Sequence, residues 1–364
     1  MKPEIADALL DLDEETDPVE QLLRQPLWRA EDLGKPIPRS PHAASVAMPL
    51  WEHVVRYEEG DPELIESLEG GYPRFVFGPA VHRLFQKCRA QFSADDELCI
   101  AFPSKKSAAR CAAFLRDTGP YATRVVPYGL NDIHVVVLPS NAFESGKKYW
   151  QHYGEIVSSR LAQATLEERS AAYGPTPEKR TLRKRIAQLV GDKSSNVYLY
   201  PSGMAALSGV LRLLRSRAPG AKTIQLGFPY VDLLKIQQKW GPLGEFYPHV
   251  SDESFDELAW QVTNEPIAGV FVEHPCNPLL QSMNIERLSK LLRPRRVPLV
   301  VDETLASFVN VDLTPYADII VTSLTKYFSG VGDVMAGSVV LNGSSPLIDE
   351  LKKYQRKVYE DRLW

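Results

Sequence analysis

Two side chains in the second half of the chain have the chemistry to hold a carbonyl cofactor. Asp302 ends the apolar segment Val300-Val301-Asp302, and Lys326 ends the next apolar run, after several hydroxyl residues. A lysine amine can form an imine with an aldehyde, and a carboxylate can keep a pyridine nitrogen protonated. A protonated pyridine ring accepts the electrons of a carbanion formed at a substrate α-carbon. The pair therefore predicts pyridoxal 5'-phosphate (PLP) as cofactor, with Lys326 as its covalent anchor.

A phosphate group would need donors, and the chain offers them at two places. Ser202, Gly203 and Met204 follow an apolar run and open an apolar helix, so main-chain N–H groups and the helix dipole could face a phosphate. Ser323 and Thr325 could add hydroxyl donors. Each feature also has an ordinary structural explanation, as a helix N-cap or a turn hydrogen bond.

Two further residues could contact the cofactor ring. Tyr230 ends an apolar run, where its ring could stack on the pyridine face, although a single tyrosine there can equally be core packing. Asn277 offers a donor and an acceptor to the phenolic oxygen of PLP or to a substrate carboxylate, although Asn-Pro also marks a turn. His274 is interpreted as structural, because Lys326 can itself move the proton.

The elements that must position these residues form a regular series. Seven apolar, β-branched runs separated mostly by helical segments predict a doubly wound, mostly parallel seven-stranded sheet. In such sheets ligands bind at the carboxyl ends of the strands, and every candidate residue follows a run. The predicted strands are Val197–Tyr200, Thr223–Leu226, Glu245–Tyr247, Ala268–Val272, Val297–Val301, Asp318–Thr322 and Gly337–Leu341.

The first half of the chain has a different organisation. Residues 1–45 are rich in proline and charge and predict a loosely ordered leader. Residues 46–145 alternate helical and strand-like patterns, which predicts a small N-terminal α/β module. A helical linker over 146–178, with one helix over Tyr149–Leu166, is expected to lead into the PLP-binding domain at 179–364.

Composition limits the class of partner. The chain has 42 basic and 46 acidic residues, a formal charge of −4, which argues against a nucleic acid or an anionic membrane surface as partner. Its four cysteines have neither zinc nor disulfide spacing, and no apolar segment predicts secretion or membrane insertion. We expect a cytoplasmic enzyme that acts on small molecules and binds no metal.

These motifs resemble the Cys/Met-metabolism family of fold-type I PLP enzymes, and within it the fungal-type cystathionine γ-synthases with an N-terminal extension. The matching stretches are Ser202–Ala206, Gly227–Asp232, Glu273–Pro278, Val301–Thr304 and Ser323–Gly330. The resemblance implies an aminotransferase-like fold and a homo-oligomer. It also implies γ-replacement, in which an O-acyl-homoserine accepts a thiol such as cysteine, as in transsulfuration and methionine biosynthesis.

The resemblance also assigns roles to residues. Lys326 becomes the Schiff base, Asp302 the partner of the pyridine nitrogen and Tyr230 the stacking ring, with Asn277 near the phenolic oxygen. The remaining implied cofactor contacts are Ser202, Gly203, Met204, Thr304, Ser323 and Thr325.

Two departures from the family pattern leave alternatives open. The family's Tyr-x-Arg pair, which reaches a neighbouring subunit's phosphate, has only Tyr173 as a candidate here. The smaller C-terminal domain, whose arginine grips the substrate carboxylate, is expected to be absent after Trp364, which would impair turnover. The chain could then be an inactive paralogue or fragment that assembles with a partner subunit. Alternatively, it could be a γ-lyase or γ-substitution enzyme of specialised metabolism.

Overall fold

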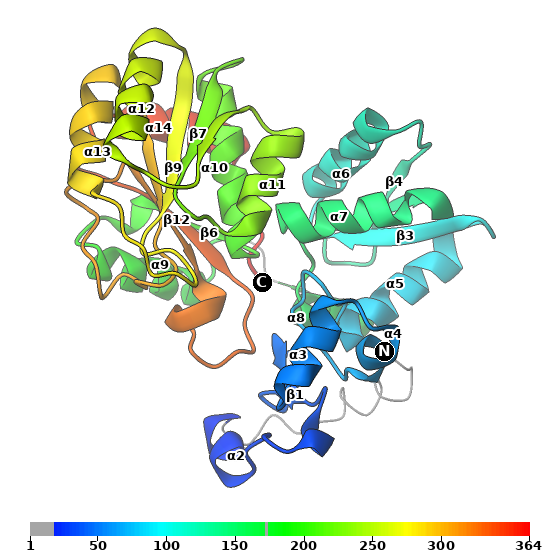
Figure 1. The fold of residues 1–364 in the computed structure, drawn as a ribbon. Coiled ribbons are helices and arrows are strands. Elements are labelled where there is room, and N and C mark those ends of the chain that lie inside the picture. The colour runs from blue at the N-terminus through cyan, green and yellow to red at the C-terminus, as the bar shows by residue number, and fades with distance from the viewer. Residues whose placement is uncertain (1–17, 172–173) are drawn as a thin grey trace. The chain divides into compact units, whose positions relative to one another are not determined.

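The computed structural model describes residues 18–171 and 174–364, and the chain divides into two compact units (Figure 1). Unit 1 comprises the chain up to Ala172, together with Ser329–Met335 and Trp364. Unit 2 comprises Tyr173–Phe328 and Ala336–Leu363. Tyr173, the candidate for the family's interface tyrosine, lies outside the described residues.

Unit 1 contains a three-stranded antiparallel sheet in the order β3-β5-β4, packed against helices. The strands of that sheet are β3 (Glu97–Phe102), β4 (Arg124–Tyr128) and β5 (Ile133–Pro139), and unit 1 also has a two-stranded sheet of β1 (Pro36–Ile37) and β2 (Ser45–Val46). Its helices are α2 (Pro18–Arg24), α3 (Trp51–Glu58), α4 (Pro62–Ser67), α5 (Pro79–Phe92), α6 (Lys105–Thr118), α7 (Phe143–Tyr153) and α8 (Ser159–Leu166). The sheet and its helices confirm the predicted small α/β module.

The prediction of a single helix over Tyr149–Leu166 is wrong. The structure has two helices there, α7 and α8, because Gly154 adopts a left-handed conformation with φ of 67° that ends α7. Ser158 then caps α8 by accepting a hydrogen bond from the Leu161 main-chain N–H at 3.1 Å. Glycine reaches this conformation without the steric cost that other residues carry, so it is a frequent helix terminator.

The segment Ser329–Met335 is tied to the rest of unit 1 by specific contacts. The Ala44 N–H donates to the Gly332 carbonyl oxygen at 2.7 Å. Arg160 donates to the Asp333 carbonyl oxygen at 2.6 Å and to its carboxylate at 3.0 Å. The segment that follows the Lys326 turn in sequence is therefore held by residues of the N-terminal half.

Unit 2 is built on a seven-stranded sheet with helices along both faces (Figure 1). Its strands are β6 (Val197–Tyr200), β7 (Lys222–Leu226), β8 (Leu243–Tyr247), β9 (Ile267–Glu273), β10 (Leu299–Asp302), β11 (Ile319–Ser323) and β12 (Gly337–Leu341). Its α-helices are α9 (Pro177–Leu189), α10 (Gly203–Arg217), α11 (Val231–Trp240), α12 (Asp252–Asn264), α13 (Ile285–Leu292) and α14 (Ile348–Val358).

The strand order, β6-β12-β11-β10-β9-β7-β8, places the site-bearing strands side by side. Strands β8, β7, β9, β10 and β11 run parallel, whereas β12 is antiparallel to both β11 and β6. Almost all residues of β9, β10, β11 and β12 are buried, which explains their continuous apolar, β-branched sequences. The seven-stranded, mostly parallel sheet confirms the predicted fold class.

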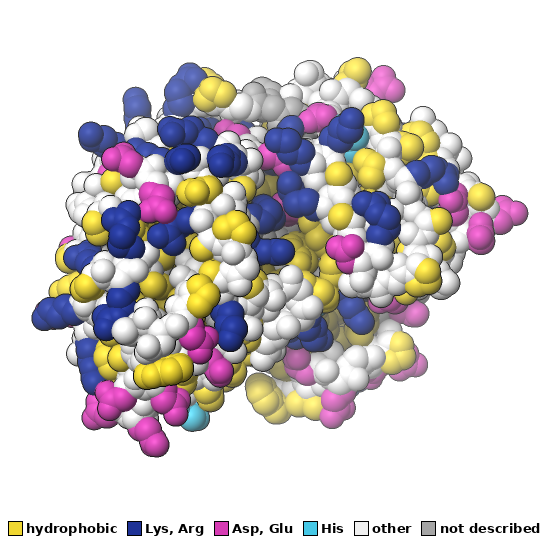
Figure 2. Space-filling view, turned by 90° about the horizontal axis from the view of Figure 1, so that it is seen from above, with side chains coloured by type: hydrophobic (Ala, Val, Ile, Leu, Met, Phe, Trp, Pro, Cys, Tyr) yellow, Lys and Arg dark blue, Asp and Glu magenta, His cyan; other side chains and the backbone are white. Residues whose placement is uncertain are grey.

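Acidic and basic side chains are both spread over the face shown in Figure 2, in keeping with the near balance of charges in the sequence. Of the helices in the described parts of the chain, none has the length and apolar character that crossing a membrane would need.

Candidate active site

The predicted site residues lie on segments at the carboxyl-terminal ends of the parallel strands of the unit 2 sheet. Asp302 ends β10 and Ser323 ends the neighbouring parallel strand β11. Strand β6 has the same direction as β11, because both are antiparallel to β12. The last residue of β6, and Ser202 after it, therefore lie at this end of the sheet as well. Carboxyl ends of parallel strands are where such sheets bind ligands.

Two backbone segments approach closely at Gly203 and Ser323. We call this place the phosphate corner, because it is predicted to hold a phosphate. A side chain at Gly203 would place its Cβ 2.8 Å from the Ser323 Cβ, and one at Gly337 would lie 2.3 Å from the Ser202 carbonyl oxygen. Only glycine fits at these two positions, and the first turn of α10 therefore lies directly beside Ser323. The Ser202 hydroxyl caps α10 by accepting from the Ala205 N–H at 3.0 Å.

Thr304 connects this corner to Asp302. Its hydroxyl donates to Asp302 Oδ1 at 2.7 Å and accepts from the Ser323 N–H at 2.9 Å. The Thr304 N–H also donates to Asp302 Oδ1, at 3.1 Å. Asp302, Thr304, Ser323 and Gly203 thus form one continuous set of contacts across β10, β11 and the start of α10.

Lys326 lies in the turn Leu324–Phe328 that follows β11, where its backbone departs from helical values (φ −85°, ψ −119°). The Thr325 hydroxyl donates to the Ala336 carbonyl oxygen at 3.2 Å and accepts from the Ala336 N–H at 3.0 Å, which ties this turn to the start of β12. The Lys326 side chain is exposed. Its covalent role and the phosphate role of Thr325 stay predictions.

Glu273 is a site residue to which sequence reasoning assigned no role. It ends β9 and is the register partner of Asp302 on β10. Its Oε2 accepts from the Tyr230 N–H at 2.6 Å and its Oε1 from the Asn277 N–H at 2.8 Å. An acidic residue at the end of the strand before Asp302 was the available signal, but only the register shows that the two carboxyl groups are neighbours.

The Glu273 and Asp302 carboxyl groups form a buried acidic pair. Burial, and then the neighbouring Asp302, raise the pKa of Glu273 to about 8, against the hydrogen bonds from Asn277 and Tyr230. Burial likewise raises the pKa of Asp302, against the two hydrogen bonds from Thr304. Among the described residues, no cation contributes to the pKa shift of either group. A cationic ring nitrogen, as PLP carries, would favour the ionised form of such a pair.

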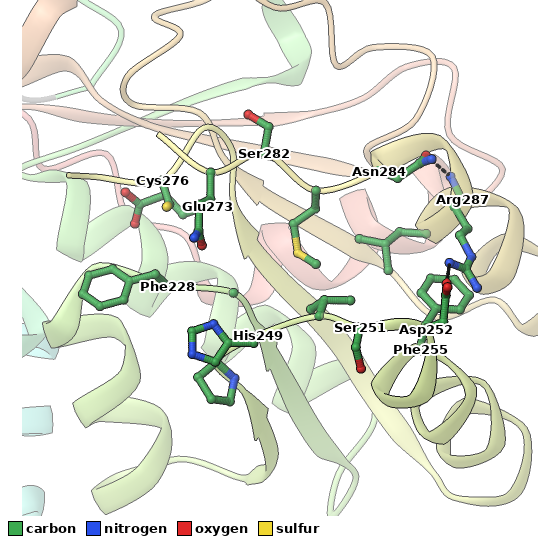
Figure 3. Close-up of a pocket in the computed structure, with 16 residues that line it drawn as sticks. Phe228, His249, Ser251, Asp252, Phe255, Glu273, Cys276, Ser282, Asn284 and Arg287 are labelled. Atoms are coloured by element: carbon green, nitrogen blue, oxygen red, sulfur yellow. Dashed lines mark hydrogen bonds and ion pairs between the residues drawn. The ribbon is translucent and has the colours of Figure 1, made fainter. Parts of the chain in front are cut away.

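A pocket of about 620 Å³ adjoins the pair on the side of β7 and β8 (Figure 3). Phe228, Glu273 and Cys276 lie at one end of it. At the other end, the Cζ atom of Arg287 lies 3.8 Å from the centre of the Phe255 ring. Its Nη1 donates to Asp252 Oδ1 at 2.6 Å. Glu273 therefore faces both this pocket and the main-chain groups of the predicted cofactor site.

Glu303, directly after Asp302, is a further buried carboxyl group. It accepts hydrogen bonds from the Thr322 hydroxyl and, at 2.7 Å, from the Phe308 N–H. Burial raises its pKa to about 8, and the hydrogen bonds from Thr322 and Phe308 oppose that shift. The group thus joins the loop after β10 to the end of β11.

We expect Glu303→Gln to flatten the pH dependence of stability. Because the folded pKa lies above the unfolded value, folded Glu303 stays protonated where the unfolded chain has lost the proton. The contribution of Glu303 to the free energy of unfolding is therefore fully present below about pH 4.5, and it falls as the pH rises to about 8. Removing this group should reduce the slope by at most about 1.4 kcal/mol per pH unit.

Urea unfolding between pH 5 and 8 measures this slope. The exposed Glu253→Gln is the control, because a hydrated carboxyl group loses little solvation on folding. Equal slopes for wild type and Glu303→Gln would contradict the role assigned to burial.

Comparison with known proteins gives a consistent picture. Residues 158–359 match the family model for the Cys/Met metabolism PLP-dependent enzymes, and residues 80–158 match the N-terminal domain of fungal trans-sulfuration enzymes. The chain is 32% identical to the cystathionine gamma-synthase-like enzyme iboG2 of Amanita muscaria, over 90% of this chain and 69% of that protein. It is 30% identical to cystathionine gamma-synthase of Saccharomyces cerevisiae, over 91% of this chain and 75% of that protein.

Solved structures match over a smaller part. The crystal structure of metB from Corynebacterium glutamicum is 29% identical with a TM-score of 0.41, and the match covers 50% of this chain and 46% of that one. The chain thus spans less than half of that solved structure. On the strength of the sequence matches, which extend over both halves, the chain belongs to the Cys/Met-metabolism family of PLP-dependent enzymes.

Proposed function

We propose that this chain carries out PLP-dependent γ-replacement, in which a thiol such as cysteine replaces the acyloxy group of an O-acyl-homoserine. The observation that carries the proposal is the set of contacts joining Asp302, Thr304, Ser323 and Gly203, with Lys326 in the turn after the same strand. The relatives named as cystathionine gamma-synthases support the choice of reaction.

The chain's own residues would divide the work as follows. When bound, PLP supplies an aldehyde for the substrate amine and a ring that takes up the electrons of the Cα–H bond. The Asp302 carboxylate keeps the ring nitrogen protonated, and Lys326 Nζ anchors the cofactor and takes the Cα proton. Tyr230 covers one face of the ring against water, and Asn277 orients the phenolic oxygen or the substrate carboxylate.

The phosphate corner gives the reaction its orientation. The N–H groups at the start of α10, from Gly203 and Met204, point out of a helix N-terminus, where an anion is stabilised. Ser202, Ser323 and Thr325 are the hydroxyl residues beside it. With the phosphate fixed there, the substrate Cα–H bond can be held near Lys326 Nζ. In the net exchange the Cγ–O bond to the acyl group would break and a Cγ–S bond would form, and the thiol proton would leave with the acyl group as a carboxylic acid.

The test is an assay that separates the possible products. Purified protein with PLP is given O-acetyl- or O-succinyl-homoserine, with and without cysteine, and the products are measured by mass spectrometry. Cystathionine that requires cysteine and the native Lys326 would support γ-replacement. A 2-oxo acid and ammonia in equal amounts with and without cysteine would instead indicate γ-elimination. If PLP binds but neither substrate is consumed, catalysis by this chain is refuted.

We further propose that the chain forms a homo-oligomer. Large apolar side chains are exposed on segments that follow β9, β10 and β11, and a second copy would cover them. They are Leu279, Leu280, Val309 and Tyr327. A monomer in analytical ultracentrifugation at high protein concentration would refute this.

A further inference from the structure

Glu273 occupies a position that connects two separate parts of the candidate site. Its two carboxylate oxygens accept hydrogen bonds from the main-chain N–H groups of Tyr230, which directly precedes α11, and of Asn277, which follows β9. These are the two residues whose side chains are proposed to contact the cofactor ring. One carboxylate therefore sets the main-chain position of both.

The ionised form of Glu273 makes both bonds well, because each oxygen then accepts from one donor. A protonated carboxyl group keeps one good acceptor, since its O–H oxygen accepts poorly. Burial and the nearby Asp302 disfavour the ionised form, as the raised pKa of about 8 indicates. Without a positive charge nearby, two effects on Glu273 therefore oppose each other. The hydrogen bonds from Tyr230 and Asn277 favour its ionised form, whereas burial and the nearby Asp302 favour its protonated form.

We propose that Glu273 is a positioning residue of the PLP site, which holds Tyr230 and Asn277 in place through their main-chain N–H groups. This inference rests on the proposed function of the site. It has a consequence for proton uptake and release: a cationic ring nitrogen beside Asp302 offsets the charge of the pair, so cofactor binding favours ionised Glu273. The proton that leaves Glu273 can reach solvent through the adjoining pocket, which Glu273 lines.

The charged groups around Glu273 are few among the described residues. Asp302 faces it from β10, and Tyr230 and Asn277 present uncharged N–H groups. Across the pocket lie His249 and Arg287, of which Arg287 is paired with Asp252. Below pH 8, PLP should therefore bind more tightly as pH rises, by at most about tenfold per pH unit for the one proton released.

The experiment compares PLP binding to cofactor-free wild type, Glu273→Gln and Glu273→Ala by absorbance titration between pH 6.5 and 9. Glutamine keeps one acceptor and turns a donor toward the other N–H, so we expect affinity to fall about tenfold at pH 8 or above. Alanine should weaken binding at least as much. The rise of affinity with pH should also be smaller in both variants than in wild type, a change that lost stability alone would not produce.

Asp318→Asn is the matched control. Asp318 is also buried, and it accepts from the Leu299 N–H at 2.9 Å and from the Ser345 hydroxyl. It precedes β11, at the amino ends of the strands and away from the site. This variant should lose thermal stability while it keeps the wild-type affinity for PLP and the wild-type pH profile.

The outcomes separate the two proposals. If wild type binds no PLP, both the proposed function and the role of Glu273 are overturned. If wild type binds PLP and folded Glu273→Gln has the same affinity and pH profile, only the role of Glu273 is overturned. If both Glu273 variants unfold, the profile of Lys326→Ala decides, because no lysine amine titrates with the cofactor in that variant: a flat affinity from pH 6.5 to 8 rejects the inference, and a rise over that range supports it.

Discussion

Lys326→Ala is expected to lower turnover by at least about 10³-fold, because the variant loses both the covalent anchor and the amine that moves the Cα proton. Steady-state cystathionine formation measures the loss. Borohydride reduction followed by peptide mass spectrometry should find the cofactor attached to the peptide that contains Lys326 in wild type, and no attachment in the variant.

The control for this prediction is Lys290→Ala. Lys290 is an exposed lysine on α13 that pairs with Glu286 at 2.6 Å, so it tests whether loss of any lysine has the same effect. We expect full activity and normal attachment. Turnover of Lys326→Ala within tenfold of wild type would show that position 326 is not the anchor.

Asp302→Asn is expected to lower turnover by about 10²–10³-fold while the cofactor stays attached. Asparagine has the same shape and can still accept from the Thr304 hydroxyl and N–H, so the local fold should persist. It carries no negative charge, so it cannot keep the ring nitrogen protonated, and the ring becomes a weaker electron acceptor. The loss should therefore appear in kcat more than in KM.

Thr304→Ser provides a comparison for Asp302→Asn. Serine keeps the hydroxyl that bridges Asp302 and the Ser323 N–H, so turnover within a few-fold of wild type is expected. A kcat for Asp302→Asn that stays within threefold of wild type would mean that the carboxylate does not act on the ring.

The sheet of unit 2 was predictable largely because its strands β9 to β12 are buried on both faces. Such strands consist of continuous apolar, β-branched runs, and all seven runs were found within two residues of their observed ends. The helix break at Gly154 was not predictable in the same way, since the apolar pattern continues through it and only the left-handed backbone interrupts it.

The strands that carry the predicted site residues could be read from the sequence, but the contacts between those residues could not. The order of Ser202, Tyr230, Asn277, Asp302 and Lys326 along the chain follows the strands that carry them. Contacts between strands depend on register, which a list of apolar runs does not contain. For that reason the pairing of Glu273 with Asp302 and the bridge through Thr304 appeared only in the structure.

The reversed direction of β12 leaves a gap between β6 and β11 at the end of the sheet that carries the candidate site. Because β12 lies between β6 and β11 and runs against both, it contributes its first residue here, and that residue is Gly337, opposite Tyr200 and Ser323. Without a side chain in the gap, two segments that belong to non-adjacent strands can touch across it. Variation at position 337 should therefore be restricted in evolution as tightly as at reactive positions, although this glycine has no functional group of its own.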